Sequence, residues 1–197
     1  MNKIIDRREA LRKTALMMGA AISASAFAGL MQGCKTTPEL TYVPQFFSED
    51  QGRLVMEVAE IIIPKTDTPG AKDVGVPGFI DTMLKECYKK EDQDRFLAGL
   101  TAFDEEAKKA YADSFIYCKP EQQVELVKKT HDAAIAESKT NKEAKRPFIL
   151  MAKELTLLGF FTSEPGATQV LQYEAVPGSY KGCLPLSGAG NGKTWAT

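Results

Sequence analysis

The chain has 197 residues, with 25 basic and 26 acidic side chains, four cysteines and a single histidine. This near-neutral balance provides no basic surface for phosphates, which argues against nucleic acid as a partner. One histidine cannot build a multi-histidine metal or haem site within this chain, and the absence of a CxxCH sequence excludes c-type haem attachment.

The first residues have the order of an export signal. A charged start containing Arg7 and Arg8 precedes a weakly apolar run over residues 14–31. Glycines and serines dilute this run, so it falls short of the about 20 apolar residues of a membrane-spanning helix. Two adjacent arginines before a weak apolar core favour the twin-arginine route. The residues flanking the arginines depart from the usual motif, which leaves general secretory export as the alternative.

The signal ends in a sequence similar to a bacterial lipobox. Leu30-Met31-Gln32-Gly33-Cys34 offers a small residue before a thiol that can be acylated after cleavage. Acyl chains on Cys34 would anchor the protein to the membrane, since each buried CH₂ contributes about 0.8 kcal/mol. Cleavage after Ala26 or Ala28 would instead release a soluble secreted protein.

We therefore expect three segments: an export signal over residues 1–33, a tether over 34–45 and a helical domain over 46–197. The signal holds five of the basic and two of the acidic residues, so the remainder has a net charge near −4. A body of this size forms one ordinary domain and buries a core without needing disulfides.

The domain opens with a helix whose start is marked by Ser48 as N-cap and Gln51 as its capping-box partner. Apolar residues recur at spacings of three and four up to Ile63, with Glu57 and Glu60 expected on the outer face. Pro64 ends this helix. A loop over residues 64–78 follows, rich in proline and glycine, and loops of this length are often functional.

Four further helices are predicted from spacing and start signals. They cover about 76–89, about 91–112, a stretch that begins at Pro120 and ends at a polar connector over 137–145, and about 147–160. Cys87 is expected near the buried face of the first of these helices, and Val124 among the apolar positions of the third. A short helix is expected over 168–173, and a glycine- and proline-rich tail follows. No period-two pattern appears, so the fold class is all-α: a single domain of about five to six helices with long loops and an irregular tail.

Few residues suggest chemistry of their own. His131 is expected as a surface histidine within a helix, because no nucleophile motif accompanies it. With Cys34 acylated, three cysteines remain: Cys87, Cys118 and Cys183. Three cysteines permit one disulfide bridge and one free thiol. Cys87 and Cys118 lie in neighbouring predicted helices and could pair. We expect no catalytic residue, cofactor site or metal site in this chain.

Two surfaces are predicted to bind a partner. The first is the loop, through Pro64, Thr66, Pro69 and Gly70. The second is the aromatic C-terminal quarter, because aromatic side chains anchor interfaces. Phe160 is expected in the core, and the docking residues are Phe161, Tyr173, Tyr180 and Trp195.

Several segments resemble the gluconate 2-dehydrogenase subunit 3 family. They are Glu60-Ile61-Ile62-Ile63-Pro64-Lys65-Thr66, Pro69-Gly70-Ala71, Phe79-Ile80-Asp81, Gly159-Phe160-Phe161-Thr162-Ser163-Glu164, Tyr173, Pro177-Gly178-Ser179-Tyr180 and Gly182-Cys183. The likeness covers most of the chain after the signal. Cys34 departs from the family pattern and suggests lipid anchoring.

The resemblance implies a non-catalytic small subunit of a periplasmic, membrane-associated FAD-dependent gluconate or sugar dehydrogenase. In such complexes a large flavoprotein subunit carries FAD and the substrate site, and a separate c-type cytochrome carries haem. The small subunit would aid export, stability or anchoring of the flavoprotein. The alternative is a stand-alone periplasmic lipoprotein with a structural or ligand-binding role.

Overall fold

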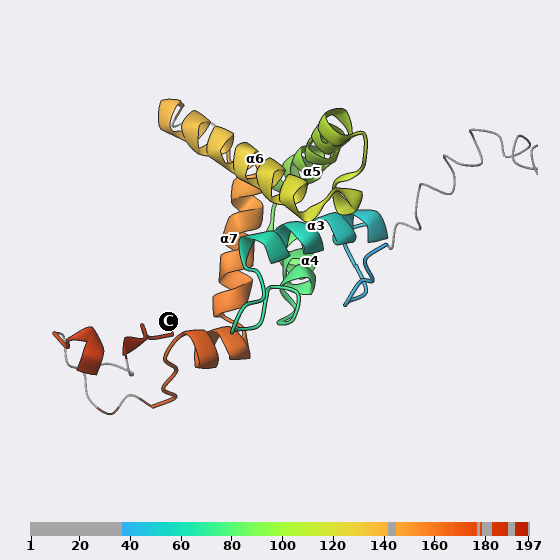
Figure 1. Ribbon diagram of the computed structural model, residues 1–197. Coiled ribbons are helices and arrows are strands. Elements are labelled where there is room, and N and C mark those ends of the chain that lie inside the picture. The colour runs from blue at the N-terminus through green and yellow to red at the C-terminus, as the bar shows by residue number, and fades with distance from the viewer. Residues whose placement is uncertain (1–36, 142–144, 177, 179–182, 189–191, 197) are drawn as a thin grey trace, which may run out of the picture. The chain divides into compact units, whose positions relative to one another are not determined.

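The five longer predicted helices are all present in the structure (Figure 1). The computed structural model describes residues 37–141, 145–176, 178, 183–188 and 192–196. Its elements are α3 (Glu49–Ile62), α4 (Val76–Cys87), α5 (Lys90–Tyr111), the 3₁₀ turn η1 (Phe115–Tyr117), α6 (Pro120–Thr140), α7 (Phe148–Phe161), the π-helix η2 (Gly166–Val170) and the 3₁₀ turn η3 (Leu186–Gly188). Within these ranges the only β pairing is one isolated bridge, so the all-α prediction is confirmed.

Helix α7 is the element against which the other helices pack. Its sequence, FILMAKELTLLGFF, is apolar at most positions rather than along one stripe. A helix of this kind is stable only where neighbours cover several of its sides. Helices α3, α4, α5 and α6 all contact α7, and α4 and α5 do so most extensively.

A chain of phenylalanine rings joins the helices inside the core. Phe96 of α5 lies edge-on to Phe148 of α7, with ring centroids 4.9 Å apart. Phe103 is 5.7 Å from Phe148 and 4.7 Å from Phe115. All four rings are buried, and such pairs add about 0.5–1.5 kcal/mol each beyond the area they bury. The aromatic residues therefore fix how α5 sits against α7.

The start of α3 follows the predicted capping box. The Gln51 amide donates to Ser48 Oγ at 3.3 Å, and the Ser48 amide donates to Gln51 Oε1 at 3.0 Å. These bonds satisfy two backbone donors that a helix start leaves without partners. The helix ends at Ile62, two residues before Pro64, as that proline requires.

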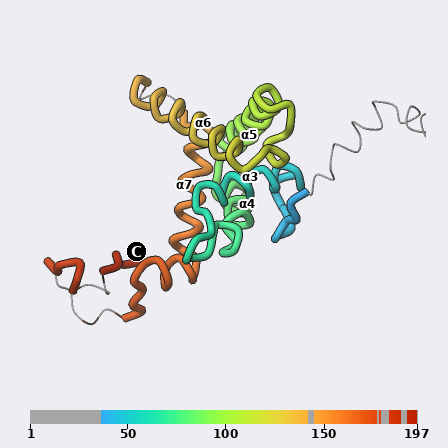
Figure 2. The backbone as a smooth tube through the Cα atoms, in the orientation of Figure 1, coloured from blue at the N-terminus to red at the C-terminus, as the bar shows by residue number. Residues whose placement is uncertain are grey.

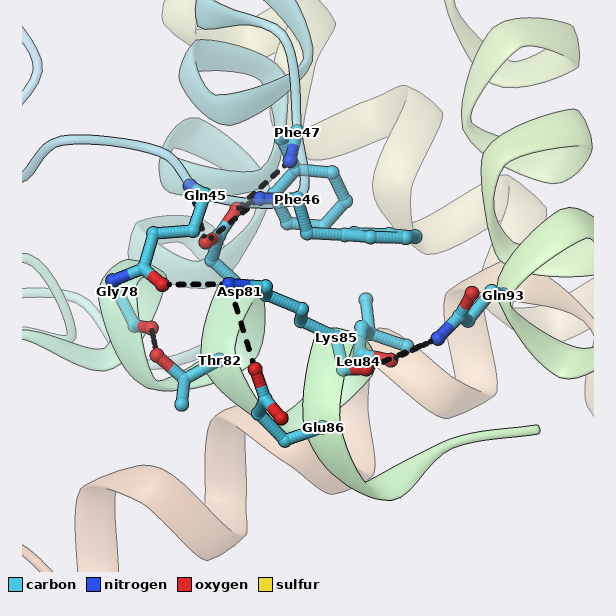
Figure 3. A network of polar contacts seen from close by, with 10 residues as sticks. All are labelled: Gln45, Phe46, Phe47, Gly78, Asp81, Thr82, Leu84, Lys85, Glu86 and Gln93. Atoms are coloured by element: carbon cyan, nitrogen blue, oxygen red, sulfur yellow. Dashed lines mark hydrogen bonds and ion pairs between the residues drawn. The ribbon is translucent and has the colours of Figure 1, made fainter. Parts of the chain in front are cut away.

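Buried Asp81 of α4 fastens the chain that leads into α3 (Figure 3). Its carboxylate accepts hydrogen bonds from three consecutive backbone amides, at 2.8 Å from Gln45, 3.2 Å from Phe46 and 2.9 Å from Phe47. These three N–H groups belong to an irregular segment and have no helical partner. The Asp81 carboxylate therefore supplies the hydrogen-bond acceptors that these backbone donors need.

The predicted tether contacts the helical body from Pro38 onward. Arg53 Nε of α3 donates to the Pro38 carbonyl at 3.1 Å. The Tyr42 side chain lies between Gly52 and Gly78, where added Cβ atoms would come within 3.0 Å and 3.4 Å of it. Burial, with a smaller effect from the nearby Asp81 charge, raises the pKa of Tyr42 well above its ordinary value. Its hydroxyl finds no hydrogen-bond partner among the described residues.

Asp104 is a second buried carboxylate, located where α5 meets η1. It accepts hydrogen bonds from Ser114 Oγ at 2.7 Å and the Phe115 amide at 2.9 Å, and it pairs with Lys108 Nζ at 2.9 Å. Burial on its own raises the pKa of Asp104, but the bonds from Lys108, Ser114 and Phe115 outweigh it and lower the pKa. The ionised carboxylate therefore stabilises the turn after α5.

Several details differ from the sequence-based expectations. Val124 is 52% exposed and Cys87 is exposed, because the buried faces of α6 and α4 are centred on neighbouring residues. The expected short helix over 168–173 is present as a π-helix, but it spans Gly166–Val170 and so begins earlier, directly after Pro165. Glu57 and Glu60 are half-buried rather than outside, because they bind the following loop.

No disulfide joins Cys87, Cys118 and Cys183, so the possible Cys87–Cys118 bridge is not formed. Cys118 is buried, and its thiol lies 3.5 Å from the Ser114 carbonyl. Among the helices that the structure describes, none combines the length and the apolar character needed to cross a bilayer. Arg7, Arg8 and Cys34, which carry the predicted export and lipid signals, lie outside the described residues.

Candidate docking surface

The Glu60 carboxylate binds two backbone amides of the loop between α3 and α4. Glu60, in the last turn of α3, accepts from the Lys65 amide at 3.1 Å and from the Lys72 amide at 2.9 Å. The Ala71 amide donates to the Ile63 carbonyl at 2.9 Å, which closes the base of the loop. These contacts give an irregular, proline-rich segment a defined conformation without regular secondary structure.

Gly70 is buried where the loop passes closest to Glu60. A Cβ at this position would come within 2.7 Å of both Glu60 Oε2 and the Lys65 backbone nitrogen. The Gly70 amide donates to Asp73 Oδ2 at 3.2 Å, and Asp73 pairs with Lys65 Nζ at 3.0 Å. The lack of a side chain at Gly70 thus allows the loop to close on Glu60.

The loop residues predicted to bind a partner differ in accessibility. Pro64 and Thr66 are exposed, Pro69 is half-buried and Gly70 is buried. The Thr66 amide donates to the Thr68 carbonyl at 3.0 Å, so the exposed part is itself a tight turn. Pro64 and Thr66 are available for contact, whereas Gly70 acts through the shape of the loop.

Exposed apolar side chains are concentrated in the C-terminal part of the chain. Seven of the nine large hydrophobic residues that are exposed in the described part of the chain come after residue 157: Leu158, Phe161, Tyr173, Val176, Leu184, Leu186 and Trp195. Scattered exposed apolar residues are ordinary, but a concentration in one segment marks a candidate interaction site. We refer to these seven residues as the C-terminal apolar set.

Phe161 is the member of this set at the last residue of α7. It is 36% exposed, and its ring stands edge-on to the buried ring of Phe160 with centroids 5.4 Å apart. The chain then turns at Ser163, whose hydroxyl donates to the Phe160 carbonyl at 2.6 Å. Buried Gly166 follows, where any Cβ would collide with the Phe160 carbonyl. Phe160 is therefore core, as expected, while Phe161 faces outward.

The tail is tied back on itself by a short parallel bridge. The Gln172 amide donates to the Thr194 carbonyl at 2.7 Å, and the Ala196 amide donates to the Gln172 carbonyl at 2.7 Å. The bridge places Tyr173 and Trp195, which are 57% and 43% exposed, on adjoining backbone segments. Figure 2 follows the backbone from α7 into this segment. Tyr180 lies outside the described residues.

In the portion of the chain that is described, no group of three or more His, Cys, Asp or Glu side chains could hold a metal ion. His131 is half-buried, its Nδ1 lying 3.2 Å from Asp132 Oδ1 and its Nε2 lying 3.0 Å from Lys153 Nζ. The expectation of an ordinary surface histidine therefore missed its contact with α7.

Glu60 and Asp81 also escaped prediction as structural residues. Both stand in segments that carry the family resemblance, but neither could be assigned a role from its neighbours in sequence. The partners of Asp81 are 34 to 36 residues away. A carboxylate one turn before a proline, followed by a glycine-rich loop, is the only local signal for Glu60.

These features define an all-helical domain with an ordered proline-rich loop and a C-terminal segment whose aromatic residues Tyr173 and Trp195 are exposed. Residues 49–178 match the model of the gluconate 2-dehydrogenase subunit 3 family, and the chain belongs to that family. This membership supports a role as a subunit of a gluconate 2-dehydrogenase complex. Comparisons with curated proteins and with solved structures give no match.

Proposed function

We propose that this protein is the non-catalytic small subunit of a periplasmic, membrane-associated FAD-dependent gluconate or sugar dehydrogenase. It docks on the flavoprotein large subunit and aids its export, stability or anchoring. The large subunit carries FAD and the substrate site, and a separate c-type cytochrome carries haem. The observation that supports docking most strongly is the concentration of the C-terminal apolar set after residue 157.

Tyr173 and Trp195 are the anchors of this docking. Both are large, exposed and amphipathic, the character that dominates binding energy at protein interfaces. The bridge at Gln172 orders the backbone next to both side chains, which reduces the entropy lost on binding. Pro64 and Thr66 of the loop supply a second, smaller contact.

Export and anchoring rest on the N-terminal signal. Arg7 and Arg8 direct the chain to the twin-arginine route, and a folded partner travels with it. Acylation of Cys34 then holds the complex at the membrane, because several acyl chains give stable attachment where one gives only marginal binding. The location is the periplasmic face of the bacterial cell envelope.

The docking claim is tested by purifying the tagged protein from its host and measuring the flavin that accompanies it. The double variant Tyr173→Ser, Trp195→Ser should lose most of the flavoprotein, at least about tenfold if the two side chains together contribute 1.4 kcal/mol or more. Val43→Ser is the matched control, since Val43 is 87% exposed and apolar but lies before α3. Equal recovery from all three proteins would reject the C-terminal docking surface.

The export claim is tested separately. Replacing Arg7 and Arg8 by lysine should retain both this chain and the flavoprotein in the cytoplasm, whereas unchanged export would remove the twin-arginine route. Intact-mass measurement of the membrane form should show the acyl chains on Cys34, and Cys34→Ser should release the protein from the membrane.

A further inference from the structure

An apolar groove lies where α3, α6 and α7 meet, and no member of the C-terminal apolar set lines it. Its volume is about 280 Å³, and its aliphatic walls come from Ile61 and Ile62 of α3, Val124 and Val127 of α6, and Ile149 of α7. The groove opens to solvent beside Val124, which is 52% exposed. An aliphatic groove of this kind can receive an apolar group and remove part of its surface from water.

One end of the groove is positively charged. Its remaining lining residues are Lys128, His131 and Lys153, and none of the residues that line the groove is acidic. Within the described ranges neither Lys128 nor Lys153 is within 4.0 Å of a carboxylate, whereas neighbouring Lys129 pairs with Glu106 at 2.9 Å. Among the described residues, neither of these two ammonium groups is therefore neutralised by a direct ion pair.

The imidazole of His131 orients Lys153. Lys153 Nζ lies 3.0 Å from His131 Nε2, and an ammonium group has only donors, so Nε2 is the acceptor in this contact. The proton of a neutral imidazole is then on Nδ1, which lies 3.2 Å from Asp132 Oδ1. This arrangement holds the Lys153 ammonium at the groove and leaves its other donors for a ligand.

The spacing along α6 brings the two kinds of side chain together. Val124, Val127, Lys128 and His131 follow one another at intervals of three, one and three residues, which places them on one face of the helix. At Val124 this face is exposed and does not form part of the core. The same short stretch thus presents an apolar surface and a cationic end.

We propose that this groove binds a small aliphatic carboxylic acid, with its chain along the Ile and Val walls and its carboxylate on Lys153 and Lys128. The volume corresponds to about nine groups the size of a water molecule at about 30 Å³ each, which matches an acid of roughly eight carbons. The carboxylate accepts charge-assisted hydrogen bonds from the lysines. This site is independent of the docking surface and of the proposed subunit role.

The test uses the full-length chain carrying ¹³C-labelled isoleucine methyl groups. Octanoate should shift the Ile61, Ile62 and Ile149 resonances saturably and should bind at least about tenfold more tightly than 1-octanol of the same chain length. Lys153→Met should remove this preference. Lys109→Met, which changes an exposed lysine of α5 outside the groove, should leave the preference intact.

A second variant tests the apolar walls without disturbing the core. Val124→Asp places a negative charge at an exposed position beside the groove and should weaken octanoate binding at least tenfold, with no change in the helix content measured by circular dichroism. Equal affinity for octanoate and 1-octanol would overturn the proposal. So would shifts that fail to saturate, or octanoate binding that survives both Lys153→Met and Val124→Asp.

Discussion

The contact of Asp81 with three consecutive backbone amides gives the sharpest prediction about stability. Asp81→Ala would remove the acceptor of the Gln45, Phe46 and Phe47 N–H groups at once. The Phe47 amide is buried, and the other two are part-buried. A buried donor left without a partner costs about 1–3 kcal/mol, and a part-buried one costs less because water reaches it.

Together these terms amount to about 3 kcal/mol of lost stability. In urea unfolding followed by circular dichroism, with an m-value of about 2 kcal/mol/M, the midpoint should fall by about 1.5 M. Asp81→Asn should fall between the wild type and the alanine variant. The oxygen of the asparagine side chain still accepts a hydrogen bond from the backbone, but its NH₂ group faces N–H donors and cannot accept from them.

Glu86→Ala is the matched control for this series. Glu86 lies on the same helix and is exposed, and its ion pair with Lys85 spans 3.5 Å at the surface. An exposed pair of this kind contributes about 0–1 kcal/mol, so the control midpoint should stay close to that of the wild type. If Asp81→Ala changes the midpoint no more than Glu86→Ala does, the capping role of the carboxylate is refuted.

Three further variants probe the other polar and close-packed positions. Asp104→Asn should cost about 1–2 kcal/mol at pH 7, because it removes the charge that a lysine and two other donors recognise. Since the pKa of Asp104 is lowered in the folded state, this stabilisation is present above about pH 4 and is lost as the pH falls through the folded pKa. The urea midpoints of the wild type and Asp104→Asn should therefore converge in acid. A constant difference between them down to about pH 2 would contradict the assignment. Gly70→Ala should cost about 1–3 kcal/mol, because the new methyl group displaces the Glu60 carboxylate, while Gly178→Ala, which meets nothing within 4 Å, should be neutral in the same thermal melts. Tyr42→Phe should leave stability unchanged or raise it by up to about 1 kcal/mol, because it removes a buried hydroxyl that no described group satisfies, and a loss above 1 kcal/mol would mean that the hydroxyl does have a partner.

Local patterns in the sequence were sufficient for the five longer helices. Ser48 and Gln51 mark the start of α3, Pro64 its end and Pro120 the start of α6, because caps and prolines act through bonds that span only a few residues. Periodicity also identified the buried faces in outline. Periodicity placed Val124 on the buried face of α6, although it is exposed, because spacing alone cannot say where the neighbouring helix ends.

The contacts that organise the loops and the groove could not be predicted in this way. Asp81 binds residues more than 30 positions earlier, and Lys153 meets His131 from a different helix, 22 positions away. Glu60 and Lys72 are brought together by the fold of the loop itself. Such pairs depend on how the helices pack, and a single sequence contains no direct record of that packing.

The location of the aromatic docking residues was predicted in part. Phe161 and Tyr173 are exposed as expected, and so is Trp195. The bridge between Gln172 and Trp195 had no signal in the sequence, because the two segments are joined by more than 20 residues without periodicity. The docking itself, like the roles of Arg7, Arg8 and Cys34, stays a prediction.

The central claim is that this chain functions as a partner of a larger flavoprotein. The most direct measurement is size-exclusion chromatography of the protein purified from its host membranes, with absorbance recorded at both protein and flavin wavelengths. We predict one peak well above the 21.6 kDa of the chain, with about one flavin per chain. A peak at the mass of the chain alone, without flavin absorbance, would contradict the claim.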